Sequence, residues 1–350
     1  NAALATAKAA GRNPRELATA LAGALTTEPP PHVTAVEVAG PGFVNFRLAH
    51  TWLHDLLADV VTAGVDGWGR FTTGHDQPII VEFVSANPTG PLHAGHGRGA
   101  CFGDSVARLL ERCGHPVSRE FYVNDRGAQM RLFADSLAAL AAGADVPEAG
   151  YQGAYVADWA TEMPSGADPV EWGRERAVAD QRAVLESLGI GFDAWFSERS
   201  MVESGAVEDT LADLQWAGAT YEDDGALWLR SSDHGDDKDR VLVKSDGEYT
   251  YLLPDVAYHR DKFARAPRLV NVWGADHHGY VARVHAAMAA LGHQPADLEV
   301  AITQMVGLQR AGEEVRLSKR TGEMIELREV VGEVGADAAR FTYLLQSVDS

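Results

Sequence analysis

The sequence predicts an α/β fold, in which a small α/β N-terminal domain precedes a doubly wound parallel sheet with an insertion. Three observations predict it. From Ile79 onward, apolar runs of strand length alternate with segments of helical periodicity. A glycine-rich stretch, residues 64–74, separates this alternation from a shorter α/β unit before it. The alternation stops at a long, mostly helical stretch and later resumes, which indicates an insertion between two half-sheets.

The N-terminal domain is expected over residues 1–66. Alanine and leucine at helical spacing predict two helices within residues 3–25, broken at Gly11 to Pro14. After three prolines the pattern changes to strands over 32–39 and 43–48 around a Gly-Pro-Gly turn, and then to an amphipathic helix over 51–61.

A larger, doubly wound domain is expected over residues 75–315, with an insertion at about 143–246, and a loop and helical region over 316–350 follows. The first half-sheet is predicted as strand 79–84, helix 93–113, strand 117–123 and helix 126–142. The insertion is predicted as a mostly helical stretch, 147–216, and short antiparallel strands over 227–229, 241–244 and 249–252. The second half is predicted as helix 255–263, strand 268–273, helix 279–291, strand 298–304, a hairpin at Gly312 and a helical segment over 327–346.

Composition excludes several classes of protein. The net charge of -20 argues against indiscriminate binding to nucleic-acid phosphates. Cys101 and Cys113 are too far apart on one predicted helix to pair, and no zinc-ligand spacing occurs, so we expect a cytoplasmic protein without a structural metal. No apolar run approaches the roughly 20 residues of a membrane span, and the first residues lack the basic flank of a secretory signal.

A turn between a strand and a helix carries the most informative short motif, His93-Ala94-Gly95-His96. A helix N-terminus presents unpaired N–H groups to an anion, and two imidazoles three residues apart add donors on the same face. Gly95 lets a flat ring or a phosphate approach the backbone. The sequence therefore predicts an ATP phosphate site at this corner.

Three other interpretations of the corner stay open. It is also compatible with a plain helix start bearing surface histidines. The nearby glycines miss the GxGxxG spacing of a dinucleotide loop, and a metal pair at His93 and His96 lacks both an intervening Glu and a third ligand.

The second motif is the basic loop Arg316-Leu317-Ser318-Lys319-Arg320. A lysine there would reach a phosphate or a departing pyrophosphate, where charge grows in the transition state. The alternative is a charged surface loop. More than 220 residues separate this loop from the corner, across two alternating half-sheets.

Together the two motifs resemble HIGH and KMSK of the class I aminoacyl-tRNA synthetases, and the surrounding sequence resembles arginyl-tRNA synthetases. This resemblance rests on residues 81–96, 122–127, 274–280, 317–327 and 335–341. Residues 12–16 and 40–46 resemble that family's N-terminal domain, which contacts the tRNA elbow. The resemblance implies a class I synthetase-type Rossmann catalytic domain, a further helical anticodon-binding domain after Ser350, and a monomer.

The resemblance also implies site residues. The ATP-binding positions are His93, Gly95, His96, Asp276, His278, Ser318 and Lys319, of which His93, His96 and Lys319 are the catalytic ones. The arginine-binding positions are Glu82, Asn87, Tyr251, Asp255 and His277. Chemistry agrees, since carboxylates and planar acceptors best hold a guanidinium. As bare residues, Glu82 would be a solvated or ion-paired strand end, Tyr251 a core aromatic, and His277 and His278 loop-surface histidines.

The reaction expected from this resemblance is activation of L-arginine by ATP, with Mg²⁺ bridging phosphate oxygens, and transfer of arginine to tRNA(Arg). Arg316 and Leu317 replace the usual Lys and Met of KMSK, which keeps charge and bulk but changes the cation's shape. Alternatives are a paralogue that delivers arginine to another acceptor, a catalytically silent binding protein, and a general nucleotidyltransferase.

Overall fold

The computed structural model describes residues 1–304, 307–310, 313–315 and 325–345. The chain divides into two compact units, Asn1–Arg70 and Phe71–Ser350, and each is described by itself. Among the described helices, not one combines the length and apolar character that crossing a membrane requires.

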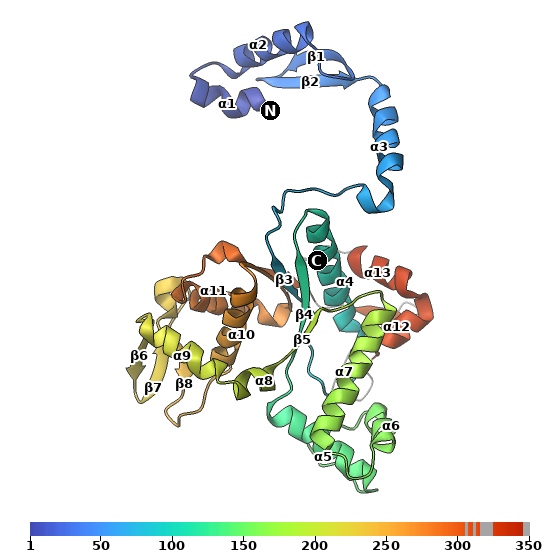
Figure 1. Ribbon diagram of the computed structural model, residues 1–350, viewed down its shortest axis with the longest axis vertical. Coiled ribbons are helices and arrows are strands. Elements are labelled where there is room, and N and C mark those ends of the chain that lie inside the picture. Colours follow the sequence, from blue (N-terminus) through green and yellow to red (C-terminus); the bar gives the residue numbers. More distant parts are fainter. Residues whose placement is uncertain (305–306, 311–312, 316–324, 346–350) are drawn as a thin grey trace. The chain divides into compact units, whose positions relative to one another are not determined.

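The N-terminal unit has the elements that its sequence predicts. They are α1 (Ala2–Ala10), α2 (Pro14–Thr27), β1 (Val33–Ala39), β2 (Phe43–Leu48) and α3 (Thr51–Gly67), with β1 and β2 antiparallel (Figure 1). The Asn13 side chain accepts from the Arg15 N–H and Pro14 occupies the first helical turn, so α2 begins where its local signals place it. Gly64 has a φ of 66° and breaks the helical geometry of α3, at the predicted start of the linker.

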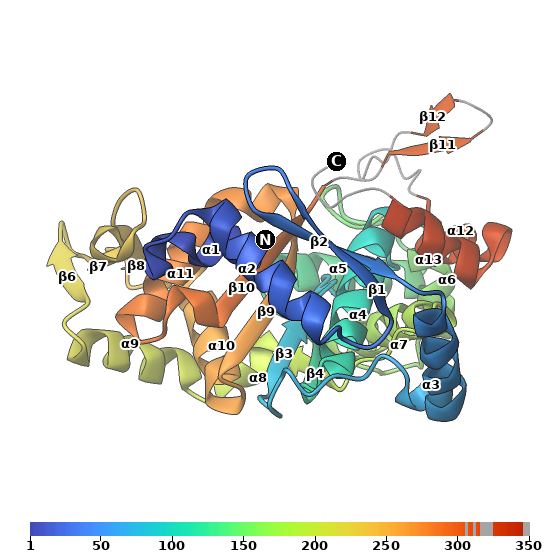
Figure 2. The same ribbon diagram turned by 90° about the horizontal axis from the view of Figure 1, so that it is seen from above.

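The second unit contains a five-stranded parallel sheet with the order β10-β9-β3-β4-β5, of which Figure 1 labels β3, β4 and β5 and Figure 2 labels β9 and β10. The strands are β3 (Ile79–Glu82), β4 (Val117–Val123), β5 (Ala194–Ser197), β9 (Arg268–Gly274) and β10 (Leu298–Thr303). The strand of this sheet that comes first along the chain, β3, thus lies between β4 and β9. In a doubly wound sheet, the crevice beyond the carboxyl ends of two such diverging strands is where ligands bind.

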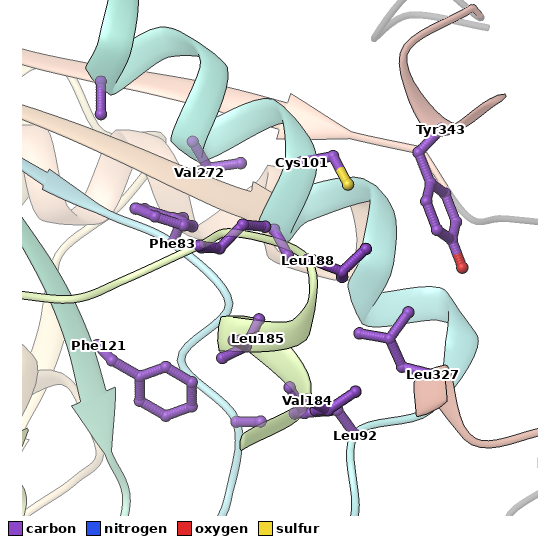
Figure 3. Close-up of a cluster of buried hydrophobic side chains, with 14 of the residues drawn as sticks. Phe83, Leu92, Cys101, Phe121, Val184, Leu185, Leu188, Val272, Leu327 and Tyr343 are labelled. Atoms are coloured by element: carbon purple, nitrogen blue, oxygen red, sulfur yellow. The ribbon is translucent and has the colours of Figure 1, made fainter. Parts of the chain in front are cut away.

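Helices cover both faces of this sheet. On one face lie α4 (Ala94–Arg112), α7 (Pro169–Ser187), α12 (Leu327–Val334) and α13 (Ala336–Leu345), and on the other lie α9 (Ala206–Trp216), α10 (Leu252–Arg265) and α11 (Val281–Ala290) (Figures 1 and 2). Ile79, Val81 and Phe83 belong to the first core, part of which Figure 3 shows, and Ile80 belongs to the second. Because side chains alternate along a strand, Glu82 faces the same side as Ile80, toward α10.

The rest of the unit forms smaller structures. The helices α5 (Gly127–Ala141), α6 (Ala154–Glu162) and α7 enclose a separate apolar cluster around Phe133 and Trp159. An antiparallel sheet contains β6 (Thr220–Asp223), β7 (Ala226–Leu229) and β8 (Arg240–Val243). The remaining elements are α8 (Glu198–Glu203), three 3-10 turns (Ser231–His234, Ala275–Tyr280 and Pro295–Asp297), and the hairpin of β11 (Leu308–Arg310) and β12 (Glu313–Val315).

The structure corrects three sequence-based assignments. Strand β5, inside the stretch predicted as helical, joins the main sheet next to β4. Four residues are too few for periodicity to separate a strand from a helix.

The small antiparallel sheet also differs from the prediction. Its strands are β6, β7 and β8, and the strand predicted over 249–252 is wrong. There Tyr249 makes only an isolated bridge to Val243, and Leu252 and Leu253 enter the core as the start of α10. The helix predicted from residue 279 begins at Val281, after a 3-10 turn.

Candidate functional site

The carboxyl end of β3 is a strained turn. Val84 has a φ of 71°, and the Ser85 N–H donates to the Phe83 carbonyl at 3.0 Å, which closes a three-residue γ-turn. A β-branched residue rarely adopts this backbone region. The turn brings the Ser85 hydroxyl to the Glu82 carboxylate, to which it donates at 2.9 Å, while it accepts from the Tyr122 N–H at 3.2 Å. Strain at this edge of the sheet thus serves to position a carboxylate.

Glu82 is buried and ion-paired. The Lys262 ammonium donates to its Oε2 at 2.6 Å, and the Lys262 side chain is 0% exposed. Of the two interpretations of Glu82 as a bare residue, the structure shows the ion-paired one. The pair gives this buried carboxylate the cationic partner that burial of a charge requires.

Asp255 lies in the first turn of α10 and accepts a hydrogen bond from the Tyr280 hydroxyl at 2.7 Å. Burial raises the pKa of the Asp255 carboxyl to about 7, and the negative charges of Glu198 and Glu82 add to the rise. The Tyr280 hydrogen bond and the Lys262 charge lower it less. A carboxyl in this state gains most from a cationic ligand, because such a ligand removes the cost of its ionisation.

Glu198 is a third carboxyl in this group, and sequence reasoning missed it. Burial raises its pKa, whereas Arg126, 3.7 Å away, and a hydrogen bond with Tyr122 lower it. It directly follows β5, the strand that periodicity did not reveal. Recognition of β5 would have placed Glu198 at the carboxyl edge of the sheet. The group formed by Glu82, Asp255 and Glu198 is called the carboxylate cluster below.

Three of the expected arginine-binding residues, Asn87, Tyr251 and His277, lie outside the carboxylate cluster. Tyr251 is 93% exposed one turn before Asp255, so it is not the core aromatic that its bare sequence favours. Asn87 is exposed and its amide donates to Gln129 at 2.6 Å. The Asn87 carbonyl accepts from the buried Gln181 side chain at 3.0 Å, which holds this loop against α7.

The motif that starts α4 forms a reciprocal cap. The His93 Nδ1 accepts from the Gly95 N–H at 3.1 Å, and the His96 Nδ1 accepts from the His93 N–H at 3.2 Å. The two rings lie 3.8 Å apart between centroids. These bonds assign the proton of each neutral ring to Nε2, the nitrogen that can donate to a phosphate oxygen. A Cβ on Gly95 would lie 2.9 Å from the His93 ring, so the glycine is required by the cap itself.

The segment that follows the basic loop pairs with this corner. The Ala94 N–H donates to the Ile325 carbonyl at 2.9 Å, and the Leu327 N–H donates to the Leu92 carbonyl at 2.8 Å. Tyr343 of α13 packs on α4 and its hydroxyl donates to the Ala94 carbonyl at 2.8 Å. Ser318 and Lys319 lie outside the described residues. The described residues that follow this loop, Ile325 and Leu327, nevertheless pair with the start of α4.

Asp276, His277 and His278 are exposed on the 3-10 turn that follows β9. The His277 Nε2 lies 3.5 Å from the Asp276 carboxylate oxygen Oδ2. The His277 ring packs against Trp273, with 5.7 Å between the ring centroids. Since β9 adjoins β3, these residues share the carboxyl edge of the sheet with Glu82. Within the described ranges, no three His, Cys, Asp or Glu side chains form a group able to hold a metal ion.

Comparison with known families gives two matches. The model of the class I (R) tRNA synthetase catalytic domain matches residues 60–146 and 178–343, and that of the arginyl-tRNA synthetase N-terminal domain matches residues 1–48. The first alone covers more than half of the chain.

Individual relatives agree. The chain is 43% identical to arginine–tRNA ligase 1 of Halalkalibacterium halodurans and 44% identical to the arginine–tRNA ligase of Geobacillus kaustophilus, and all of it aligns in both cases. It spans 66% of the length of each, just under two thirds.

Solved structures of two such proteins share the fold of this chain. A Campylobacter jejuni protein assigned as an arginyl-tRNA synthetase superposes with a TM-score of 0.78 at 36% identity, over 87% of this chain and 70% of that one. The Thermus thermophilus arginyl-tRNA synthetase shares the fold with a TM-score of 0.71 at 23% identity, over 97% of this chain and 67% of that one. The chain therefore belongs to the arginyl-tRNA synthetase family of class I tRNA synthetases.

Proposed function

We propose that this protein is an arginine–tRNA ligase. It activates L-arginine with ATP, forming arginyl-adenylate and pyrophosphate, and transfers the arginyl group to tRNA(Arg). The observation that carries the proposal is the carboxylate cluster beside a histidine-capped helix start, since this pairs a site for a cation with a site for phosphates. The N-terminal unit would contact the tRNA.

Arginine recognition would centre on Asp255. Its carboxylate, oriented by Tyr280, matches the fork of a guanidinium, and Glu82 supplies further negative potential. Asn87, Tyr251 and His277 would complete the site. Tyr251 is exposed one turn before Asp255, so its ring would be accessible to a ligand bound at that carboxylate.

Activation itself needs positioning and charge stabilisation rather than a protein nucleophile. The arginine carboxylate attacks the α-phosphorus of ATP, a new O–P bond forms, and the bond to pyrophosphate breaks. The Nε2–H groups of His93 and His96 would donate to the phosphates, and Lys319 would stabilise the departing pyrophosphate. Gly95 would seat the adenine, and Asp276, His278 and Ser318 would complete the ATP site.

Magnesium would enter bound to ATP. The ion would supply positive charge at the phosphates, whose oxygens are ligands that Mg²⁺ prefers. We further propose a monomer, domain limits at 1–66, 75–315 and 316–350, and a location in the cytoplasm, which the two unpaired cysteines suit.

The test is arginine-dependent exchange of pyrophosphate into ATP by the full-length protein in the presence of tRNA(Arg). We expect exchange with arginine and background levels with lysine or citrulline, which lack a guanidinium. Equal exchange with citrulline, or none with arginine, would contradict the proposal.

Arginine affinity should depend on pH. Below about pH 7 Asp255 is protonated and neutral, and above it the carboxylate is available to the guanidinium. We therefore expect the Kd for arginine to fall as pH rises from 6 to 7, by at most about tenfold, and to level off above 8. Calorimetry at pH 6 in buffers of different ionisation enthalpy should show proton release on binding. A Kd that is constant over this range would show that the charge of Asp255 is not used.

A further inference from the structure

A buried chain of hydrogen bonds links the Glu82 carboxylate to the backbone carbonyl of Asp255, whose side chain is the second carboxylate expected to bind arginine. Lys262 donates to Glu82 Oε2 at 2.6 Å and to Asn271 Oδ1 at 2.8 Å. The Asn271 amide donates to His259 Nε2 at 2.7 Å, and His259 Nδ1 donates to the Asp255 carbonyl at 2.7 Å. This set of residues, Glu82, Lys262, Asn271, His259 and the Asp255 backbone, is called the buried relay below.

The relay has its polar groups satisfied. The third face of the Lys262 ammonium lies over the Tyr258 ring, 4.3 Å from its centroid. His259 accepts on one ring nitrogen and donates from the other, which requires the neutral ring. Burial and the charge of Lys262 lower its pKa well below the usual value, so the ring stays neutral. Lys262 and Asn271 are 0% exposed and His259 is 2% exposed, so water does not compete for these bonds.

The geometry of the relay connects three elements. Glu82 ends β3, Asn271 lies on β9, and Lys262, His259 and Asp255 lie on α10. Without the relay, α10 would be held over the sheet by apolar packing and by the bonds of Tyr258 and Arg265 to Glu120, which lie C-terminal to Asp255 on the helix. Apolar packing tolerates small shifts more readily than directed bonds do. A shift of α10 would move Asp255 relative to Glu82.

We infer that Lys262 is a positioning residue for arginine recognition. Through the buried relay it holds Asp255 at a set place relative to Glu82, and its charge offsets part of the charge of Glu82. The inference depends on the proposed function and adds to it a residue that does not touch the substrate.

The chain offers a matched control on the same helix. Arg265, three residues after Lys262, donates to Glu120 at 2.5 and 3.0 Å, and Glu120 is 0% exposed. Glu120 is the ladder partner of Glu82 on the neighbouring strand. This second pair lines a separate cavity of about 510 Å³ with Trp195 and Ser200, away from Asp255. Removal of the Arg265 guanidinium also leaves a buried carboxylate, that of Glu120, without its cation. This change does not break the relay.

The experiment compares Lys262→Met and Arg265→Met in pyrophosphate exchange by the full-length protein with tRNA(Arg). For Lys262→Met we expect the KM for arginine to rise at least about tenfold, with the KM for ATP and kcat changed less than about threefold. For Arg265→Met we expect the KM for arginine to stay within about twofold, although thermal stability falls in both.

Asn271→Ala serves if Lys262→Met does not fold. It breaks the relay at its centre and leaves the ion pair, and we expect a rise of about threefold or more in the KM for arginine. Equal KM values for arginine in the relay variants and the control would overturn the inference while the proposed function stands. Failure of the unmodified protein to bind arginine by calorimetry would overturn both.

Discussion

Replacement of Asp255 by Asn is expected to raise the KM for arginine by roughly 100- to 1,000-fold, with little change in the KM for ATP. Asn keeps the shape of the side chain and an acceptor for the Tyr280 hydroxyl, so the change removes only the charge. The guanidinium then faces a neutral amide in a partly buried site, where a charged partner contributes most. Steady-state exchange at pH 8, with each substrate varied in turn, measures the effect.

The same variant is expected to be more stable than the parent protein when no arginine is bound. Because burial raises the pKa of Asp255 in the folded state, ionisation at pH 8 costs folding free energy. We expect Asp255→Asn to gain on the order of 2 kcal/mol at pH 8, a figure reduced for the partial exposure of the carboxyl. This gain in stability should shrink as pH falls below 7. It should vanish near pH 4, because the Asp255 carboxyl then becomes protonated in the unfolded protein as well as in the folded one. Denaturant unfolding at pH 8 and pH 5 checks the sign. A loss of stability at pH 8 would contradict the assignment.

Replacement of His96 by Ala is expected to lower kcat for arginine activation by roughly 100-fold or more, with the Kd for arginine changed less than about threefold. The imidazole Nε2–H would be lost from the phosphate site, where charge changes in the transition state, while the carboxylate cluster remains intact. Pre-steady-state adenylate formation with tRNA(Arg) present measures the chemical step. Calorimetry measures the arginine Kd.

His96 also caps α4, so a second variant separates the two roles. His96 Nδ1 accepts from the His93 N–H, and Gln at this position is able to take over such a cap. We expect His96→Gln to keep thermal stability and yet remain slow in adenylate formation. Recovery of the rate in His96→Gln would show that the cap, rather than phosphate binding, explains the loss in His96→Ala.

Much of the architecture was predictable because its signals are local. The short, fully buried strand at Ile79, the Asn13 cap with Pro14, and the break at Gly64 each depend on residues a few positions apart. The histidine motif was predictable for the same reason, since its cap bonds span three residues. Strand β5 was not, because four residues are too few for a periodic pattern and only the pairing with β4 makes them a strand.

The sequence by itself determined most elements of the parallel sheet, the doubly wound alternation and the place of the histidine motif at a helix start, together with the likeness to arginyl-tRNA synthetases. Only the tertiary structure decided that Glu82 is paired with Lys262, that Glu198 joins Asp255, and that Tyr251 is exposed. The physical reason is the separation along the sequence of the residues that interact. Periodicity and caps act between near neighbours, whereas the ion pair joins residues 180 positions apart, and the charge state of a buried carboxyl depends on every element packed around it.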